Sequence, residues 1–244
     1  MRTASRAAVL SDVHGNAVAL EAVLGELERE QPDLVVFCGD LTWGPLPEAT
    51  LELLAGLPHP ALYVRGNAER ALLERSESPT DRERWLLERH SEQALGFLAT
   101  FAEHVVVDIA GLGAVRFCHG SPRSDEELVT PETPEERVRA MTAGISERVL
   151  VTAHTHLQSD RRVAGLRSVN AGSVGMPYED RPGAFWALLG PDVELRRTDY
   201  PVERALERYR SRGDPMTEQM VELLVSPPSR AEVIEHAERL EFSG

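Results

Sequence analysis

The sequence contains no lysine. All 26 basic residues are arginine, 40 residues are acidic, and the formal net charge is −14. Without lysine, neither Schiff-base chemistry nor a lysine general base is available to the protein. The acidic balance also disfavours the binding of long nucleic acids, and with it a nuclease, because such proteins need a basic surface along the phosphate backbone.

Cysteines and long apolar runs are also scarce. Cys38 and Cys118 are the only cysteines, too few for a disulfide scaffold in 244 residues, and each ends an apolar run where a small buried residue is expected. No window approaches the roughly 18 apolar residues of a membrane span. Residues 1–10 also lack the apolar stretch of an export signal. We therefore expect a cytoplasmic protein without membrane contact, built as a single domain over residues 1–244.

Short apolar runs alternate with helical patterns in the first third of the chain. Strands are expected at 7–10, 34–37 and 61–64, with helices over 18–27 and 47–55 between them. This alternation indicates βαβ units and a mainly parallel sheet. Ligands bind at the carboxyl ends of such strands, and each of these three strands is followed by a polar cluster.

The remainder of the chain is less regular. Residues 70–104 are rich in glutamate, arginine and leucine and are expected to form a helical excursion that overhangs the site. Residues 201–244 are expected to form a helical tail without recognisable chemistry. Further strands are expected at 105–109, 115–118, 149–152, 161–163, 167–169, 185–189 and 193–197. Strands that first alternate with helices and then form hairpins predict an α/β fold of two packed sheets with helices outside.

Five of these strands end in side chains that can bind metal ions. In chain order they deliver Asp12 with His14, Asp40, Asn67, His119, and His154 with His156. Imidazole and carboxylate ligands together suit divalent transition metals. Residues two apart in a strand face the same side, so each Asp-x-His or His-x-His pair can point into one cavity if the strand persists or the turn bends suitably. One such pair is weak support, but five clusters at strand ends predict a metal site.

This ordered series of motifs resembles the calcineurin-like metallophosphoesterases, and more closely their small prokaryotic members than the protein Ser/Thr phosphatases. The resemblance runs from Val9 to about Leu189. It implies a double β-sheet sandwich flanked by helices and hydrolysis of phosphoester bonds. Carried over position by position, it implies one metal ion held by Asp12, His14, Asp40 and His156. It implies a second ion held by Asp40, Asn67, His119 and His154, with Asp40 bridging the two.

The expected chemistry follows from those ligands. Two cations about 3.5–4 Å apart can clamp the attacking and leaving oxygens of a displacement at phosphorus, and a hydroxide bridging them is the expected nucleophile. Asp40, His119 and Asn67 are therefore the expected catalytic residues. Manganese is the first expectation for the cofactor, with iron, zinc or nickel as alternatives. The histidines must be neutral to bind, so metal affinity should fall as they become protonated.

The sequence departs from many relatives at Ala68. In those relatives a histidine follows the Gly-Asn pair and helps to protonate the leaving group or to steady the transition state. The resemblance is therefore to the subgroup that lacks this histidine, whose members hydrolyse activated aryl phosphoesters. General acid catalysis typically supplies 10²–10⁴-fold. His59, His90 and His104 are the candidates for a replacement, against the plainer interpretation of solvated surface histidines.

Two residues are predicted to contact the substrate. Asn16 opens the first helix, where backbone N–H groups favour an anion, and Arg65 is placed to reach a phosphate oxygen, with a structural salt bridge as the alternative. Glu69 is expected to support the site as a hydrogen-bond acceptor, Ser173 to support it through its hydroxyl or amide, and Trp43 either to wall the pocket or simply to pack.

Several functions stay open at this point. The leading hypothesis is hydrolysis of a small phosphoester, with a protein phosphatase or a dinucleoside polyphosphate hydrolase as alternatives. An alternative of another class is a non-catalytic metal-binding scaffold that tethers a partner. A small phosphoester is the expected partner, and association into a homo-oligomer stays open.

Overall fold

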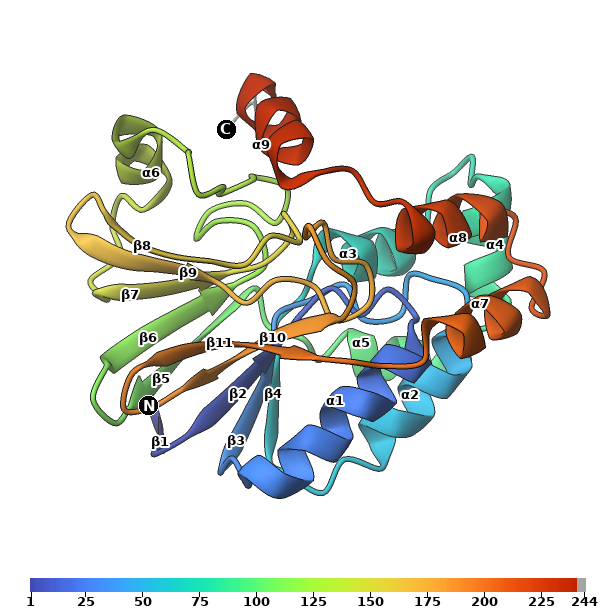
Figure 1. Ribbon diagram of the computed structural model, residues 1–244, viewed down its shortest axis with the longest axis horizontal. Coiled ribbons are helices and arrows are strands. Elements are labelled where there is room, and N and C mark those ends of the chain that lie inside the picture. The colour runs from blue at the N-terminus through green and yellow to red at the C-terminus, as the bar shows by residue number, and fades with distance from the viewer. Residues whose placement is uncertain (241–244) are drawn as a thin grey trace.

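The computed structural model describes residues 1–240 and contains two β-sheets (Figure 1). The strands of the first sheet are β2 (Ala7–Leu10), β3 (Leu34–Phe37), β4 (Ala61–Tyr63), β10 (Ala184–Leu189) and β11 (Val193–Thr198). Those of the second are β1 (Arg2–Ala4), β5 (His104–Ile109), β6 (Gly113–Cys118), β7 (Val149–Thr152), β8 (Ser159–Val163) and β9 (Leu166–Asn170). The strand order is β11-β10-β2-β3-β4 in the first sheet and β1-β5-β6-β7-β9-β8 in the second.

The three central strands of the five-stranded sheet, β10, β2 and β3, are buried on both faces, and side-chain alternation divides their residues between two cores. In β2, Ala7 and Val9 pack in the core between the two sheets, whereas Ala8 and Leu10 belong to the core on the opposite face, under the helices. All four are fully buried. Strands buried on both faces consist of continuous apolar residues, which explains the apolar runs in the sequence.

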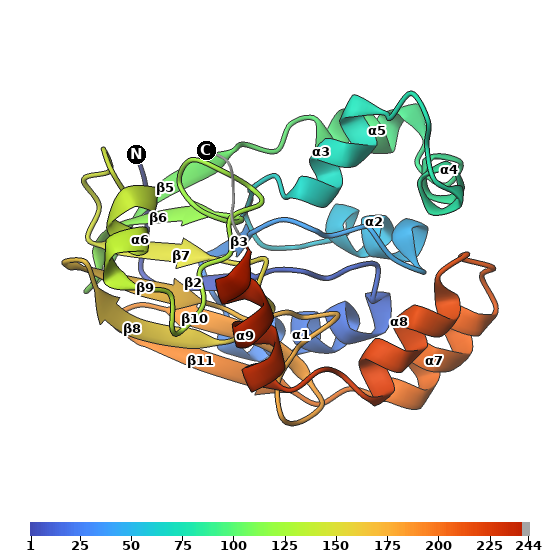
Figure 2. The same cartoon turned by 90° about the horizontal axis from the view of Figure 1, so that it is seen from above.

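Helices cover the outer faces of the sandwich. Their bounds are α1 (Ala17–Glu30), α2 (Pro47–Ala55), α3 (Asn67–Glu74), α4 (Asp81–Leu87), α5 (Glu92–Leu98), α6 (Glu135–Met141), α7 (Val202–Arg210), α8 (Thr217–Val225) and α9 (Arg230–Arg239). Figure 2 shows α3, α4 and α5 on one side of α1 and α2, and α7 and α8 on the other side. No helix within residues 1–240 is both long and apolar enough to cross a membrane.

The predicted double-sheet sandwich flanked by helices is confirmed, with some differences in detail. Strand β1 was not predicted, because it is only three residues long and gains its stability by pairing in parallel with β5. Helix α3 begins at Asn67, before the start predicted for the helical excursion, because the Glu69 side chain accepts the Gly66 N–H and caps its first turn. Within the excursion, Thr80 and Ser91 cap α4 and α5.

Parallel pairing sets the direction of the strands that carry polar clusters. In the first sheet β2 pairs with β3 and β3 with β4, all in parallel, and in the second sheet β6 pairs in parallel with β7. The carboxyl ends of each parallel set therefore lie at one edge of their sheet. Residues that follow these five strands meet where the two edges come together.

Candidate metal centre

The seven residues predicted as metal ligands come together at this edge. Asp12, His14 and His156 form one group, and Asp40, His119 and His154 form another, with the potential ligand atoms of each group within 4.8 Å of one another. Asn67 joins the second group through a 3.0 Å contact between its Oδ1 and Nε2 of His119. We call these seven residues the ligand cluster.

A left-handed backbone at most of these positions directs the side chains into the cluster. The positive φ angles are 51° at Asp12, 47° at His14, 56° at Asp40, 65° at His154 and 59° at His156. Residues other than glycine adopt this conformation rarely and at a cost, and they concentrate at functional sites. Of the two alternatives given for the paired ligands, the bent turn is the one observed, because β2 ends at Leu10 and β7 at Thr152. Turns, and not strand alternation, point both members of each pair inward.

The first group is compact and almost fully buried. Nε2 of His14 lies 3.1 Å from Nε2 of His156, and Nε2 of His156 lies 3.3 Å from Oδ1 of Asp12. Neighbouring ligands of an ion bound at about 2.0–2.2 Å are separated by about 3 Å. The spacing of these atoms therefore fits a common ion.

The second group connects to the first through Asp40. Nε2 of His119 lies 3.1 Å from Nδ1 of His154 and 3.5 Å from Oδ1 of Asp40. The other oxygen of the same carboxylate, Oδ2, lies 3.7 Å from Nε2 of His14 in the first group. Asp40 thus presents one oxygen to each group, as a ligand shared by two ions would.

Backbone carbonyls fix the tautomers of three histidines. Nδ1 of His14 donates to the Trp43 carbonyl at 3.2 Å, Nδ1 of His156 to the Met176 carbonyl at 2.7 Å, and Nδ1 of His119 to the Cys38 carbonyl at 2.7 Å. A carbonyl only accepts, so in the neutral rings each Nε2 keeps a free lone pair. These lone pairs face one another and the carboxylates, an arrangement that suits a cation between them.

A buried carboxylate oxygen also indicates a place for a cation. Oδ2 of Asp12 accepts hydrogen bonds from the Ser11 hydroxyl at 2.6 Å and from the His154 N–H at 3.2 Å. Among residues 1–240, Oδ1 of the fully buried Asp12 has no hydrogen-bond partner. Buried polar atoms are rarely left unpaired, so this oxygen fits the role of a metal ligand.

Burial and mutual repulsion shift the pKa values of the cluster. Burial, together with the neighbouring His156 or His119, lowers the pKa of His14 and of His154 to about 3. Burial raises the pKa of Asp40 to about 7, against the attraction of His119. Burial also lowers the pKa of His119, but Asp40 and Asp12 outweigh it and the net shift is upward. Two histidines are thus neutral and ready to bind, whereas a proton competes for Asp40 and His119.

Glu69 holds Asp40 in place. Its Oε2 accepts the Asp40 N–H at 2.8 Å and its Oε1 accepts the Leu41 N–H at 2.7 Å. Gly66 is required nearby, since a Cβ there would lie 2.1 Å from Oδ1 of Asp40. Ser173 supports the other side, because its hydroxyl donates to the Asp12 carbonyl at 2.7 Å.

The family model of the calcineurin-like phosphoesterase superfamily domain matches residues 6–189. The chain belongs to this superfamily. The resemblance inferred from the motifs, to small prokaryotic phosphoesterases of this type, is confirmed. The ligand cluster lies wholly within the matched residues, so the site belongs to the phosphoesterase domain.

Solved structures similar to this phosphoesterase cover nearly all of the chain. A metallophosphoesterase from Sphaerobacter thermophilus is 26% identical with a TM-score of 0.75, and the match covers 92% of this chain and 99% of that one. A hypothetical protein from Pyrococcus horikoshii OT3 has the same fold, with 20% identity, a TM-score of 0.78 and coverage of 93% and 99%. An uncharacterized protein of Methanocaldococcus jannaschii is 22% identical over 84% of this chain and 91% of its own length.

The phosphoesterase has a cavity of about 350 Å³ beside the ligand cluster. It is lined on one side by His14, Asp40 and Asn67 together with Trp43 and Ala68. The other lining residues are Ala71, Arg82, Met176, Tyr178, Met216, Gln219, Met220 and Leu223. We call the part contributed by α3, α4 and the segment from Met216 to Leu223 the helical wall. Helix α8 thus brings part of the predicted helical tail, in which the sequence shows no recognisable chemistry, to the lining of this cavity.

The two predicted substrate contacts lie outside this cavity lining. Asn16 caps α1 as expected, but its fully buried side chain accepts the Ala19 N–H and donates to the Gly175 carbonyl and to Tyr200. Its side-chain groups are occupied within the protein. Arg65 pairs with Glu103 at 3.2 Å, the structural salt bridge named as the alternative.

The three histidines considered as replacement acids also lie elsewhere. His90 is buried rather than solvated, with its ring nitrogens bonded to the Leu86 carbonyl at 2.8 Å and the Thr42 hydroxyl at 2.9 Å. His104 is exposed at the start of β5, and His59 is half-buried beside a different cavity. None of them lines the cavity at the ligand cluster.

Arg82 and Tyr178 are the residues that sequence reasoning missed. The Tyr178 ring stacks on His156 with centroids 4.8 Å apart, and burial raises the pKa of its hydroxyl to about 12. Arg82 lies in α4, and its positive charge contributes to the low pKa of His14. No motif marks either residue; only the packing of distant segments brings them to the site.

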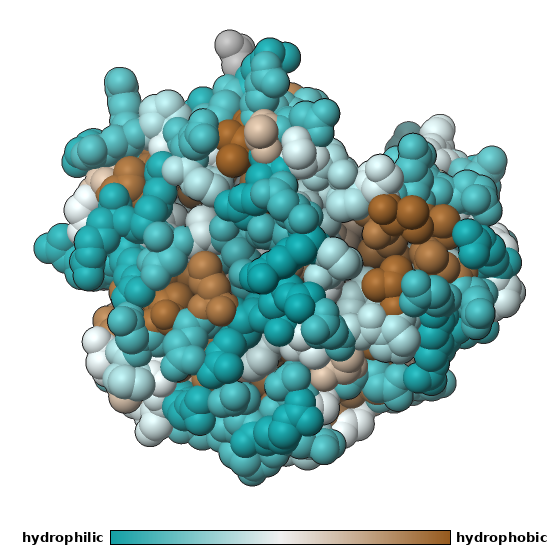
Figure 3. All heavy atoms as spheres, in the orientation of Figure 1, coloured by the Kyte–Doolittle hydropathy of each residue, from teal (hydrophilic) through white to brown (hydrophobic). Residues whose placement is uncertain are grey.

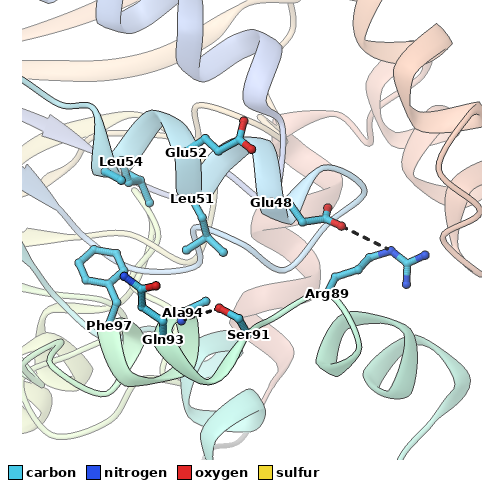
Figure 4. Close-up of a pocket in the computed structure, with 10 residues that line it drawn as sticks. Glu48, Leu51, Glu52, Leu54, Arg89, Ser91, Gln93, Ala94 and Phe97 are labelled. Carbon is cyan, nitrogen blue, oxygen red and sulfur yellow. Dashed lines mark hydrogen bonds and ion pairs between the residues drawn. The ribbon is translucent and has the colours of Figure 1, made fainter.

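Other cavities lie in the molecule, and two of them are lined mainly by α8 and α9 or by α2 and α5. One of about 740 Å³ shares Tyr178, Gln219 and Leu223 with the lining of the site and lies between α8 and α9, where Figure 3 shows a notch in the surface. The other, of about 510 Å³, lies between α2 and α5 (Figure 4) and has the ion pair of Glu48 and Arg89 at its rim. Only the first of these two cavities shares lining residues with the cavity at the ligand cluster.

Proposed function

We propose that this chain hydrolyses the phosphoester bonds of small molecules, as a phosphodiesterase or phosphatase, with two divalent transition-metal ions. The carboxylate of Asp40 is the observation that carries this proposal, because its two oxygens face two separate ligand groups. A centre with only one ion would leave the residues of the other group with no ion to bind. Manganese is the first candidate for both ions, with iron, zinc or nickel as alternatives.

The bound cations would supply an acidified water as nucleophile and neutralise charge on the phosphoryl oxygens. The chain contributes neutral histidines and the neutral amide oxygen of Asn67, so the ligand cluster adds little negative charge beyond Asp12 and Asp40. A centre with this balance stays cationic and attracts a phosphoester anion into the cavity.

Ala68 shapes the expected substrate preference. It is buried, lines the cavity and has only its backbone N–H near the centre, which donates to Oδ1 of Asp40 at 3.0 Å. Without a proton donor at this position, the leaving group departs with its negative charge. Esters of acidic alcohols, such as aryl phosphates, are therefore the preferred substrates, and the rate should depend steeply on the pKa of the leaving group.

A metal-loaded assay tests the proposal. Protein reconstituted with Mn²⁺ is expected to contain about two ions per chain and to hydrolyse bis-p-nitrophenyl phosphate, whereas chelated protein should be inactive. Metal content comes from elemental analysis and activity from release of nitrophenolate. A protein that binds two ions but turns over neither diesters nor monoesters would instead favour the non-catalytic scaffold.

A further inference from the structure

We propose that Arg82 binds the phosphoryl group of the substrate from the helical wall. This inference rests on the proposed function, because it names the residue that positions the phosphoester beside the ligand cluster. Arg82 comes from the helical excursion and not from a strand end. It is the only arginine among the residues that line the cavity with Asp40 and Asn67.

The guanidinium of Arg82 has more donors than the described part of the chain satisfies. One terminal nitrogen donates to Oδ2 of Asp214 at 3.2 Å, and the other contacts the sulfur of Met216 at 3.2 Å. The Nε–H has no partner within residues 1–240. Arginine has five N–H bonds, and a thioether sulfur is a weak acceptor.

Burial makes these unpaired donors significant. The Arg82 side chain is only 9% exposed. Buried donors nearly always find a partner, and one that lacks a partner in the protein commonly meets a ligand. The planar, permanently charged guanidinium matches the geometry of phosphate oxygens, which are the strong acceptors that these donors lack.

Asp214 holds Arg82 in a fixed position. Its side chain is fully buried, and its Oδ1 accepts the Met216 N–H at 2.9 Å just before α8 begins. The ion pair therefore joins α4 to the segment just before α8, more than a hundred residues further along the chain. An arginine held in this way loses little conformational freedom when it binds an anion.

The charges around the cavity also favour an anion. With two cations in the ligand cluster, Arg82 would present a further positive charge to the same 350 Å³ space. A phosphoester placed between them neutralises both sides. Arginine is never deprotonated in proteins, so Arg82 stabilises charge and does not replace the missing proton donor at Ala68.

Binding of inorganic phosphate to the Mn²⁺-loaded protein tests the inference without relying on turnover. We expect Arg82→Gln to weaken phosphate binding, measured by calorimetry, about tenfold to a hundredfold, as expected for loss of hydrogen bonds to a charged group. Arg82→Lys should keep part of the affinity. Arg84→Gln is the matched control, because Arg84 lies on the same helix, is exposed and does not line the cavity.

A purely structural role for Arg82 is distinguished by two further variants. Arg82→Gln combined with Asp214→Asn removes both charges, so the fold keeps no unpaired buried carboxylate, and phosphate binding should remain weak. Asp214→Asn alone leaves the arginine but not its anchor and should give an intermediate affinity. Metal content, measured for every variant, should stay unchanged.

The inference is overturned if the wild-type protein binds no phosphate, or if the double variant binds it as tightly as wild type at equal metal content. Failure of the proposed function can be distinguished from failure of this inference. If the wild-type protein hydrolyses no ester, the role of Arg82 is still tested by comparing the phosphate affinities of the wild-type protein and the variants. Where turnover is present, KM for bis-p-nitrophenyl phosphate should rise in Arg82→Gln and not in Arg84→Gln.

Discussion

The two sides of the cavity are built by different means. The ligand cluster comes from residues that directly follow buried strands, and its side chains are fixed by left-handed turns and backbone hydrogen bonds. The helical wall comes from short helices joined by side-chain contacts, such as the ion pair of Arg82 and Asp214. The first side depends on backbone geometry, and the second depends on packing.

Because the two sides are built differently, we expect the ligand cluster to determine turnover and the helical wall to determine which substrates bind. Changes in the ligand cluster should alter metal content and abolish turnover, because under the proposed function each ligand would share a common ion with its neighbours. Changes in the helical wall should leave the metals in place and alter how tightly a particular substrate binds. The following variants test that separation, beginning with the largest expected effect.

Replacement of Asp40 by asparagine should have the largest effect. Asp40 is the one residue with an oxygen toward each ligand group, so its loss weakens both ion sites together. We expect kcat/KM to fall at least about a thousandfold, below the value for His119→Ala, with fewer than two ions retained per chain. Steady-state kinetics and elemental analysis measure both quantities. More activity in Asp40→Asn than in His119→Ala would contradict the bridging role.

Replacement of Gly66 by alanine should displace the same carboxylate without removing it. The added Cβ would lie 2.1 Å from Oδ1 of Asp40, so the side chain must move. We expect Mn²⁺ affinity to fall about tenfold to a hundredfold, as for other changes in the support of a ligand. Gly96→Ala is the control, because a Cβ at Gly96 meets nothing within 4 Å. Equal metal affinity in both variants would show that Asp40 tolerates displacement.

Metal affinity should depend on pH through Asp40 and His119 rather than through all of the histidines. The pKa of Asp40 is raised to about 7, while His14 and His154, with pKa values of about 3, stay neutral. Below pH 7 a proton must leave for the ion to bind, so affinity should fall about tenfold per pH unit towards pH 5. Calorimetry in buffers of different ionisation enthalpy measures the proton released. Affinity that is constant from pH 5 to 7 would contradict this assignment.

Truncation of Leu223 should have the smallest effect and test the helical wall directly. Leu223 is half-buried on α8 and lines the cavity, whereas its neighbour Leu224 is half-buried but does not. We expect Leu223→Ala to raise KM for an aryl phosphate about three- to tenfold through lost apolar contact, with unchanged metal content. Leu224→Ala should leave KM unchanged. A loss of metal from Leu223→Ala would contradict the expectation that changes in the helical wall leave the metal content unaltered.

The ligand cluster could be predicted from the sequence because its signal is local. A buried strand is a short apolar run, and the polar residue after it is visible at once, as at Leu10 and Asp12. Conformation was harder to predict: nothing in the sequence Asp-Val-His indicates a left-handed backbone at non-glycine residues, so a persisting strand and a bent turn stayed open as alternatives. Asn16 was predicted to contact substrate from its place at the start of a helix, and in the structure its side chain caps that helix.

The helical wall could not be predicted because its signal is not local. Arg82 is one of many arginines on amphipathic segments, and only its pairing with Asp214 distinguishes it. The partner lies 132 positions further along the chain, in a tail that carries no motif. A contact of that kind depends on the docking of whole helices, which no pattern within either helix specifies.

Each group of the ligand cluster draws its residues from both sheets. His14 follows a strand of the five-stranded sheet and His156 a strand of the six-stranded sheet, and the two lie 142 positions apart in the chain. Bound ions would therefore act as cross-links between the sheets. Because the ions would be released when the chain unfolds, their binding to the folded protein would raise the free energy of unfolding, and more so at higher metal concentration. The sheets would then be unable to slide or separate at this edge without first releasing metal, so unfolding and metal loss would become a single event.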